Sequence, residues 1–92
     1  MPLTVRENPD RNRFEAVDES GVVAGFAAFR RHADRVVFTH TEVDDAFEHQ
    51  GVGSTIVLRA LDTVREEGLR VVAQCPFVTS FIEEHREYAD LT

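Results

Sequence analysis

The first half of the chain alternates between apolar and polar residues with a period of two, which is typical of half-buried β-strands. Clusters of turn-forming residues interrupt the alternation at positions 18–21 and 31–34. Because short turns join antiparallel neighbours, this half predicts an antiparallel meander. Its expected strands are residues 3–8, 13–17, 22–31 and 35–43, and the first of them is expected at an edge of the sheet.

After residue 43 the apolar spacing changes to three and four, which is typical of a helix with one buried face. We expect this helix over residues 51–67, with Gly68 in the left-handed position that commonly ends a helix. A short strand, residues 69–75, and a terminal helix, residues 78–85, follow it. The βαβ order predicts that the last strand lies parallel to residues 35–43. Residues 1–92 are therefore expected to form one α+β domain with a mixed antiparallel and parallel sheet.

Composition limits the class of protein. The chain has 92 residues, 42% of them hydrophobic, which is enough for one packed domain. No apolar run approaches the roughly 20 residues that cross a bilayer, and the N-terminus lacks the apolar core of a signal peptide. A single cysteine, Cys75, excludes an internal disulfide framework, and four scattered histidines show no zinc spacing. We expect a cytoplasmic protein with no metal site and no membrane partner.

Charge gives a second limit. Seventeen acidic residues oppose ten basic ones, and all ten are arginine, for a net charge of −7. An acidic surface argues against nucleic acid as a partner, because nucleic-acid binding depends on neutralising phosphates. An acidic chain without lysine is typical of a halophilic protein, in which high salt screens self-repulsion. A GC-rich genome that prefers arginine codons is the alternative explanation.

The turn between the strand of residues 35–43 and the long helix carries the most specific chemical signal. Gly51 and Gly53 let the backbone turn sharply and leave its N–H groups uncovered. The first N–H groups of a helix lack partners and carry partial positive charge, so this turn predicts a phosphate site. Without lysine it is no P-loop, and Ile56 stands where a dinucleotide fingerprint needs its third glycine.

Three motifs around this turn resemble the GCN5-related N-acetyltransferases, and most closely their very small, single-domain members. The resemblance covers nearly the whole chain. The matching stretches are Phe38-Thr39-His40-Thr41-Glu42-Val43, Gln50-Gly51-Val52-Gly53-Ser54, and Cys75-Pro76-Phe77-Val78 followed by His85-Arg86-Glu87-Tyr88.

The resemblance implies a minimal acyl-CoA N-acyltransferase fold in which acetyl-CoA lies between two splayed parallel strands, here residues 35–43 and 69–75. The pantetheine arm would pair with backbone groups at Thr41 and Val43. The pyrophosphate would rest on the turn formed by Gln50, Gly51, Val52, Gly53, Ser54 and Thr55.

The chain departs from the family at two positions. The family pattern Gln/Arg-x-x-Gly-x-Gly/Ala has Glu48 at its first position here, which would repel the phosphates. Screening at high salt, or a carboxylate that points away, would reduce that cost. Small members often carry proline where this chain has Arg86, so the last turn is expected to differ.

Acetyl transfer needs a neutral amine, support for the tetrahedral oxyanion and a proton for the leaving thiolate. Glu42 or His40 is the expected base, and strand alternation puts them on one face unless a bulge intervenes. Cys75 is a candidate nucleophile, although a buried cysteine is often only a small apolar residue. Tyr88 and His85 are candidate proton donors to the leaving sulfur, with closure of the core as the alternative role.

The sequence therefore predicts an N-acetyltransferase that moves an acetyl group from acetyl-CoA to an amine. The acceptor is a protein, peptide, polyamine or small molecule, and the chain is a monomer or a homodimer. The main alternative is a CoA-binding module without transferase activity. A third reading is a small interaction domain that uses its exposed sheet edge and whose CoA groove has decayed.

Overall fold

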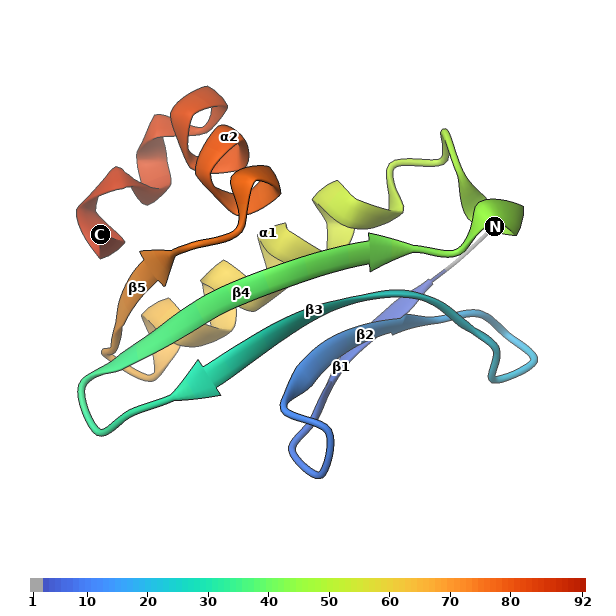
Figure 1. Ribbon diagram of the computed structural model, residues 1–92, viewed down its shortest axis with the longest axis horizontal. Helices are drawn as coiled ribbons and strands as arrows, with labels where there is room; N and C mark the ends of the chain where they lie inside the picture. The colour runs from blue at the N-terminus through green and yellow to red at the C-terminus, as the bar shows by residue number, and fades with distance from the viewer. Residues whose placement is uncertain (1–2) are drawn as a thin grey trace.

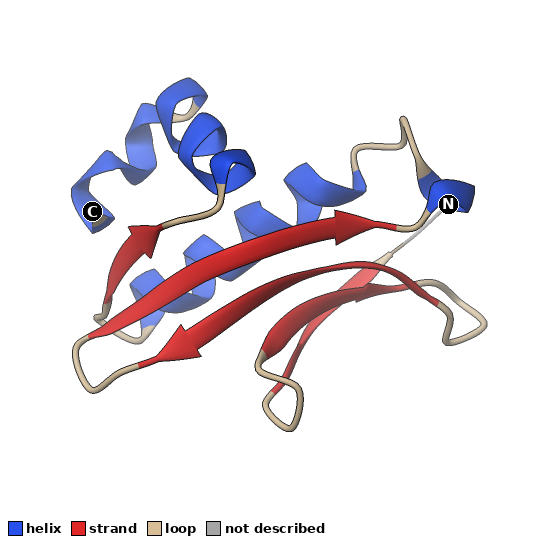
Figure 2. Ribbon diagram, viewed as in Figure 1, coloured by secondary structure: helices blue, strands red, loops and turns tan. Residues whose placement is uncertain are grey.

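A five-stranded sheet with strand order β1-β2-β3-β4-β5 forms the centre of the computed structural model, which describes residues 3–92. The first four strands pair antiparallel, and β5 pairs parallel to β4 (Figures 1 and 2). The predicted α+β fold with a mixed sheet is confirmed. The strands are β1 (Thr4–Asn8), β2 (Arg13–Val17), β3 (Val23–Arg31), β4 (Arg35–Val43) and β5 (Arg70–Ala73).

Two α-helices and two short 3-10 segments complete the fold. They are α1 (Val52–Glu66), α2 (Pro76–Glu84), η1 (Asp45–Phe47) and η2 (Arg86–Leu91). Gly68 has the left-handed φ of 72° expected after the end of α1. The last strand ends two residues earlier than predicted, and α2 begins at Pro76 rather than at residue 78. Proline suits the first turn of a helix, because its missing N–H would have no partner there.

The core lies between the sheet and α1. The predicted apolar positions of α1 are all buried, and they pack with Phe14, Phe29 and Phe38 from three neighbouring strands. The ring centroids of Phe14 and Phe29 are 5.2 Å apart, and those of Phe29 and Phe38 are 6.4 Å apart. Helix α2 adds Val78, Phe81 and Ile82 to the same core cluster. The hydrophobic pattern therefore places both helices against one continuous core.

A β-bulge in β4 changes which side chains face this core. Phe29 pairs with Phe38 and Ala28 pairs with His40, so Thr39 is an extra residue without a partner on β3. One inserted residue reverses the alternation of every following side chain. Phe38 therefore faces α1, whereas His40 and Glu42 beyond the bulge lie on the open face of the sheet.

Gly25 allows β4 to approach α1 closely just after the bulge. A Cβ atom at Gly25 would lie 2.7 Å from the Glu42 carbonyl oxygen and 3.2 Å from both the Val43 Cα and the Val52 Cγ1. Two of these three atoms belong to the backbone, which has little room to move. Gly25 is thus required by the packing of β4 against the start of α1.

We predict that Gly25→Ala lowers the free energy of unfolding by about 1–3 kcal/mol, because overpacking forces backbone shifts. The matched control is Gly53→Ala, where the added Cβ would meet the Phe77 ring at 2.7 Å. That ring is 40% exposed and can turn aside, and alanine is favoured over glycine in a helix by up to about 1 kcal/mol. Urea denaturation measures both variants. A Gly25→Ala protein as stable as the parent would contradict this account.

Candidate functional site

The strands β4 and β5 separate after Phe38, and this gap is the centre of the candidate site. The carbonyl oxygen of Phe38 accepts hydrogen bonds from the N–H groups of both Gln74, at 3.0 Å, and Cys75, at 3.1 Å. Strand pairing runs only as far as Phe38 and Ala73, while β4 continues to Val43. The second half of β4 therefore has a free edge on the β5 side.

The free edge of β4 presents backbone groups at Thr41 and Val43. The Asp44 N–H donates to the Ala24 carbonyl at 2.8 Å, so Asp44 faces β3. Backbone direction alternates along a strand, so Glu42 also faces β3 and the residues on either side of it face the gap. An extended ligand chain can pair with these N–H and C=O groups as an added strand does.

An uncapped helix N-terminus adjoins this edge. Gly51 is the N-cap of α1, with a left-handed φ of 71°, and no side chain caps the helix. The first intrahelical bond runs from the Thr55 N–H to the Gly51 carbonyl at 3.0 Å. The N–H groups of Val52, Gly53 and Ser54 have no acceptor within the described part of the chain. Three free donors and the helix dipole favour an anion at this position.

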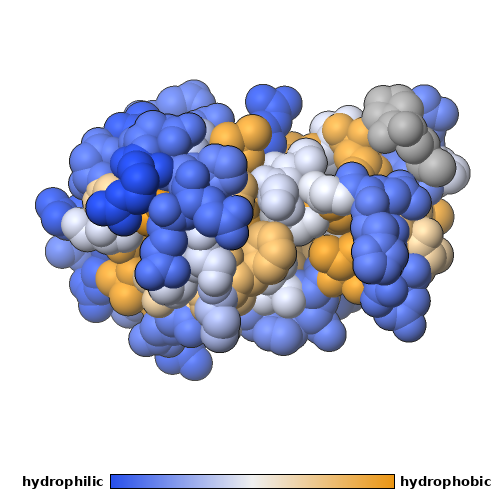
Figure 3. Space-filling model, turned by 90° about the horizontal axis from the view of Figure 1, so that it is seen from above, coloured by the Kyte–Doolittle hydropathy of each residue, from blue (hydrophilic) through white to orange (hydrophobic). Residues whose placement is uncertain are grey.

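A hollow of about 330 Å³ joins the strand edge to the helix start. Val43 lines it from β4, Glu48 and His49 line it from the loop, and Phe77 lines it from α2, together with the first residues of α1. Seen from above, the surface between α2 and the loop before α1 is pale to orange, whereas the flanks are blue (Figure 3). Glu48 is one of the lining residues, so an acidic residue lies beside the free N–H groups of α1.

His40 and Glu42 meet on the open face of the sheet. The His40 Nε2 lies 3.4 Å from a Glu42 carboxylate oxygen, and the two side chains are 58% and 61% exposed. The His40 ring also meets Phe26 edge to face, with centroids 6.1 Å apart. A carboxylate and an imidazole in contact can accept a proton and pass it to solvent.

Thr41 and Cys75 meet on the other face of β4. The Thr41 Oγ1 lies 3.3 Å from the Cys75 Sγ, and Cys75 is only 3% exposed. Cys75 is the N-cap of α2 and not the end of a strand, which corrects the predicted boundary. Of the predicted catalytic residues, His40 and Glu42 thus lie on one face of β4 and Cys75 lies on the other. The Thr41–Cys75 contact could not be predicted, because the bulge that turns Thr41 toward Cys75 leaves no sequence signal.

The Tyr88 hydroxyl is directed elsewhere. It donates to Asp62 on α1 at 2.7 Å, and this hydrogen bond, together with burial, raises the pKa of Tyr88 to about 12. At 1.5 Å per residue, Asp62 lies about 15 Å along α1 from Val52. The structure therefore does not bring this hydroxyl together with His40, Glu42 or Cys75 through any described contact.

His85 lies closer to the helix start. Its ring stacks on Phe81 with centroids 4.1 Å apart, and it lines a small hollow of about 120 Å³ that Ser54 and Phe77 also line. His85 is therefore beside the predicted phosphate turn. None of the described contacts joins it to the groups on β4.

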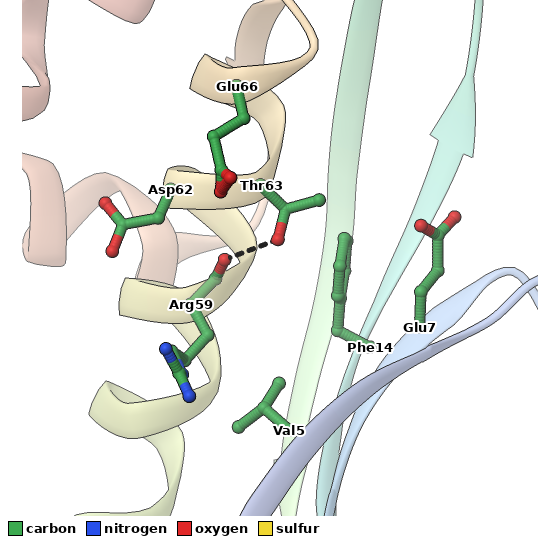
Figure 4. Close-up of a pocket in the computed structure, with 7 residues that line it drawn as sticks. All are labelled: Val5, Glu7, Phe14, Arg59, Asp62, Thr63 and Glu66. Atoms are coloured by element: carbon green, nitrogen blue, oxygen red, sulfur yellow. Dashed lines mark hydrogen bonds between the residues drawn. The ribbon is translucent and has the colours of Figure 1, made fainter.

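A further hollow of about 270 Å³ lies between β1 and α1 (Figure 4). Val5 and Glu7 line it from the strand side, and Arg59 and Thr63 line it from the helix side. No residue that the sequence predicts for the site takes part in it. Residues 3–92 contain no cluster of three or more potential metal ligands, and no helix among them is long and apolar enough to cross a membrane.

Comparisons with known proteins agree with this geometry. The family model described as GCN5-related N-acetyl-transferase matches residues 13–91. A GCN5-like protein of Staphylococcus aureus, named as a candidate N-acetyltransferase, is 25% identical with a TM-score of 0.71, over 97% of this chain and 86% of that one. No curated protein sequence matches.

Two larger proteins share the fold over part of their length. The GNAT family N-acetyltransferase YhbS of Escherichia coli, solved in complex with CoA, is 28% identical with a TM-score of 0.59, over 66% of this chain and 38% of that one. Ard1 of Thermoplasma volcanium is 26% identical with a TM-score of 0.57, over 72% of this chain and 45% of that one. The chain thus spans less than half the length of these two. By its family match, its sheet and its divergent β4 and β5, the chain belongs to the GCN5-related N-acetyltransferase family.

Proposed function

We propose that this protein binds acetyl-CoA in the gap between β4 and β5 and transfers the acetyl group to an amine. The observation that carries the proposal is the free edge of β4 directly beside the uncapped N-terminus of α1. One feature accepts an extended amide-bearing chain and the other accepts an anion, and CoA has both parts. The CoA complex of the related Escherichia coli enzyme supports the assignment.

In this proposal the pyrophosphate rests on the free N–H groups at the start of α1, and the pantetheine arm pairs with Thr41 and Val43. Gln50 and Gly51 complete the turn. The Thr55 hydroxyl donates to the Gly51 carbonyl at 2.9 Å, so Thr55 holds the turn in shape and offers its side chain less to the ligand. The thioester then lies at the end of the gap, where β4 and β5 separate.

The chemistry follows from the two groups on β4. The amine nitrogen attacks the thioester carbonyl carbon, and Glu42, with His40 beside it, accepts the proton that the amine loses. The Val43 N–H supports the tetrahedral oxyanion. The C–S bond then breaks, the amide forms, and the CoA thiolate takes up a proton. In this proposal the leaving sulfur lies near Thr41 and Cys75, which meet on the helix-covered face of β4.

We predict that Glu42→Gln lowers kcat for acetyl transfer by roughly 10²-fold or more, because general-base catalysis contributes about that much. The Kd for CoA should stay unchanged, because the Glu42 side chain lies on the open face of the sheet and the Glu42 backbone groups face β3. Thiol release from acetyl-CoA with an amine panel measures kcat, and calorimetry measures Kd.

Glu19→Gln, in the turn between β2 and β3, is the matched control for loss of one exposed charge. Cys75→Ala separates direct transfer from a Cys75 acyl intermediate, since only the intermediate requires the thiol. Tight CoA binding without turnover on any amine would favour the binding module over the enzyme.

We predict that Glu48→Arg tightens CoA binding roughly tenfold at low salt, because a repelling charge in the wall of the hollow becomes an attracting one. The gain should shrink as salt rises, since exposed charges are screened. Glu19→Arg makes the same change of net charge far from the hollow and should leave the Kd unchanged. Equal Kd values for the parent and Glu48→Arg would show that Glu48 does not face the phosphates. A parent without affinity that Glu48→Arg restores would favour a decayed groove.

We predict that Tyr88→Phe lowers the free energy of unfolding by about 1–3 kcal/mol, the usual worth of a hydrogen bond to a charged group. The folded pKa of Tyr88 lies above its ordinary value of 10, so this contribution is present below pH 10 and is lost as the pH rises toward 12. Denaturation at several pH values measures it. The kcat should stay within about threefold of the parent. A loss of kcat of tenfold or more with normal CoA affinity would instead make Tyr88 the proton donor to the sulfur.

A further inference from the structure

Another hollow, of about 250 Å³, lies on the open face of the sheet. It is lined by Arg13 from β2, by Gly25 and Phe26 from β3, and by Glu42 and Asp44 at the end of β4. Val43 lines both this hollow and the one at the start of α1. A molecule held here would therefore approach the gap from the side opposite the helices, with Glu42 in its path.

Arg13 is held in a fixed position above an aromatic floor. Its guanidinium carbon lies 4.4 Å from the centroid of the Phe26 ring, and its Nε donates to Glu15 at 2.6 Å. Its two terminal nitrogens have no hydrogen-bond partner among residues 3–92. A guanidinium with one nitrogen tied down and two free is well placed to bind a carboxylate with two parallel hydrogen bonds.

Glu15 holds Arg13 in place. Glu15 is 1% exposed, and it also accepts hydrogen bonds from Arg6 and Asn8. Burial would raise the pKa of Glu15, but the hydrogen bonds from Arg13, Arg6 and Asn8 bring it below its ordinary value. A buried charged carboxylate is costly unless it is paired. The pairing of Glu15 with Arg13 therefore holds the arginine at the rim of the hollow.

The wall of the hollow opposite Arg13 carries negative charge. Phe26 is paired with Glu42 on β4, and the Arg13 guanidinium from β2 lies over its ring, so a cation and an anion both adjoin Phe26. Within the described residues Arg13 and Glu42 form no ion pair with each other. Asp44 adds a second carboxylate, one oxygen of which accepts the Ala46 N–H at 2.9 Å. The hollow thus has one positive end and one negative end with an apolar floor between them.

We infer that this hollow binds the acetyl acceptor and that the acceptor is a small amino-carboxylate. The amine lies beside Glu42 and the carboxylate lies on Arg13, with the intervening carbons beside Phe26. This inference rests on the proposed function for its chemistry: the acceptor nitrogen forms the amide bond, the thioester C–S bond breaks, and Glu42 takes the amine proton. A diamine fits less well, because its second ammonium would meet Arg13.

Three four-carbon probes test the inference in the presence of CoA: 4-aminobutyrate, 1-aminobutane and 1,4-diaminobutane. We expect 4-aminobutyrate to bind at least tenfold more tightly than the other two by calorimetry, and to have the highest kcat/KM with acetyl-CoA. Arg13→Gln should remove the preference for the carboxylate, so that 4-aminobutyrate binds no more tightly than 1-aminobutane.

Arg6→Gln is the matched control, because Arg6 binds the same Glu15 but does not line the hollow. Arg6→Gln should keep the preference for 4-aminobutyrate. This result would show that losing one partner of Glu15 does not by itself remove the preference. Arg13→Lys keeps the charge without the planar fork and should keep only part of the preference.

The outcomes separate this inference from the proposed function. The inference would be overturned by equal affinity for the three probes or by a preference for the diamine. It would also be overturned if Arg6→Gln lost the preference as fully as Arg13→Gln. Acetyl transfer to any of the three probes would still support the proposed enzyme activity. Failure to bind CoA and to release thiol would overturn the proposed function. Binding of 4-aminobutyrate is measured apart from turnover, so it tests the hollow in either case.

Discussion

One backbone carbonyl decides where the sheet of this protein divides. The Phe38 oxygen accepts both the Gln74 and the Cys75 N–H groups, so the chain leaving β5 turns away from β4 at this atom. The bulge at Thr39 lies one residue further on and reverses the side chains that follow it. Together they leave an unpaired strand edge in a small protein, which would invite aggregation unless a ligand or a neighbouring element used it. The location of that edge beside the start of α1 is what makes it a binding gap.

The charges around the gap work against each other. The uncapped N–H groups of α1 favour an anion, while we propose that Glu48 in the wall of the same hollow repels one. A helix N-terminus carries the equivalent of about half a positive charge, so the full negative charge of a nearby carboxylate can offset it at low ionic strength. Salt screens the exposed carboxylate more than the hydrogen bonds, which depend on contact. We propose that a net charge of −7 without lysine reflects a protein that works where such screening is strong.

Alternation and helical spacing predicted the order of the strands, the long helix and the parallel pairing of β5. The exact position of the site was harder to predict. Residues 38–43 alternate equally well with or without a bulge, so the pattern could not show that Thr41 would meet Cys75 while Glu42 faced away. The start of α2 at Pro76 was not predicted either, although proline suits the first turn of a helix. Tyr88 matched a family motif, but its hydroxyl binds Asp62, a pairing that connects residues 26 positions apart and has no local sequence signal.

The bulge also explains why the two faces of β4 can have different roles. Without the extra residue, His40 and Glu42 would lie on the same side as Phe38, under the helices and away from solvent. With it, the gap side carries Thr41 and Cys75, and the open side carries the only described carboxylate–imidazole contact of the sheet. An amine that reaches Glu42 from solvent would need no passage through the core. The buried Glu15 then has a role beyond stability, because the arginine that it fixes lies on the same open face, across Phe26 from Glu42.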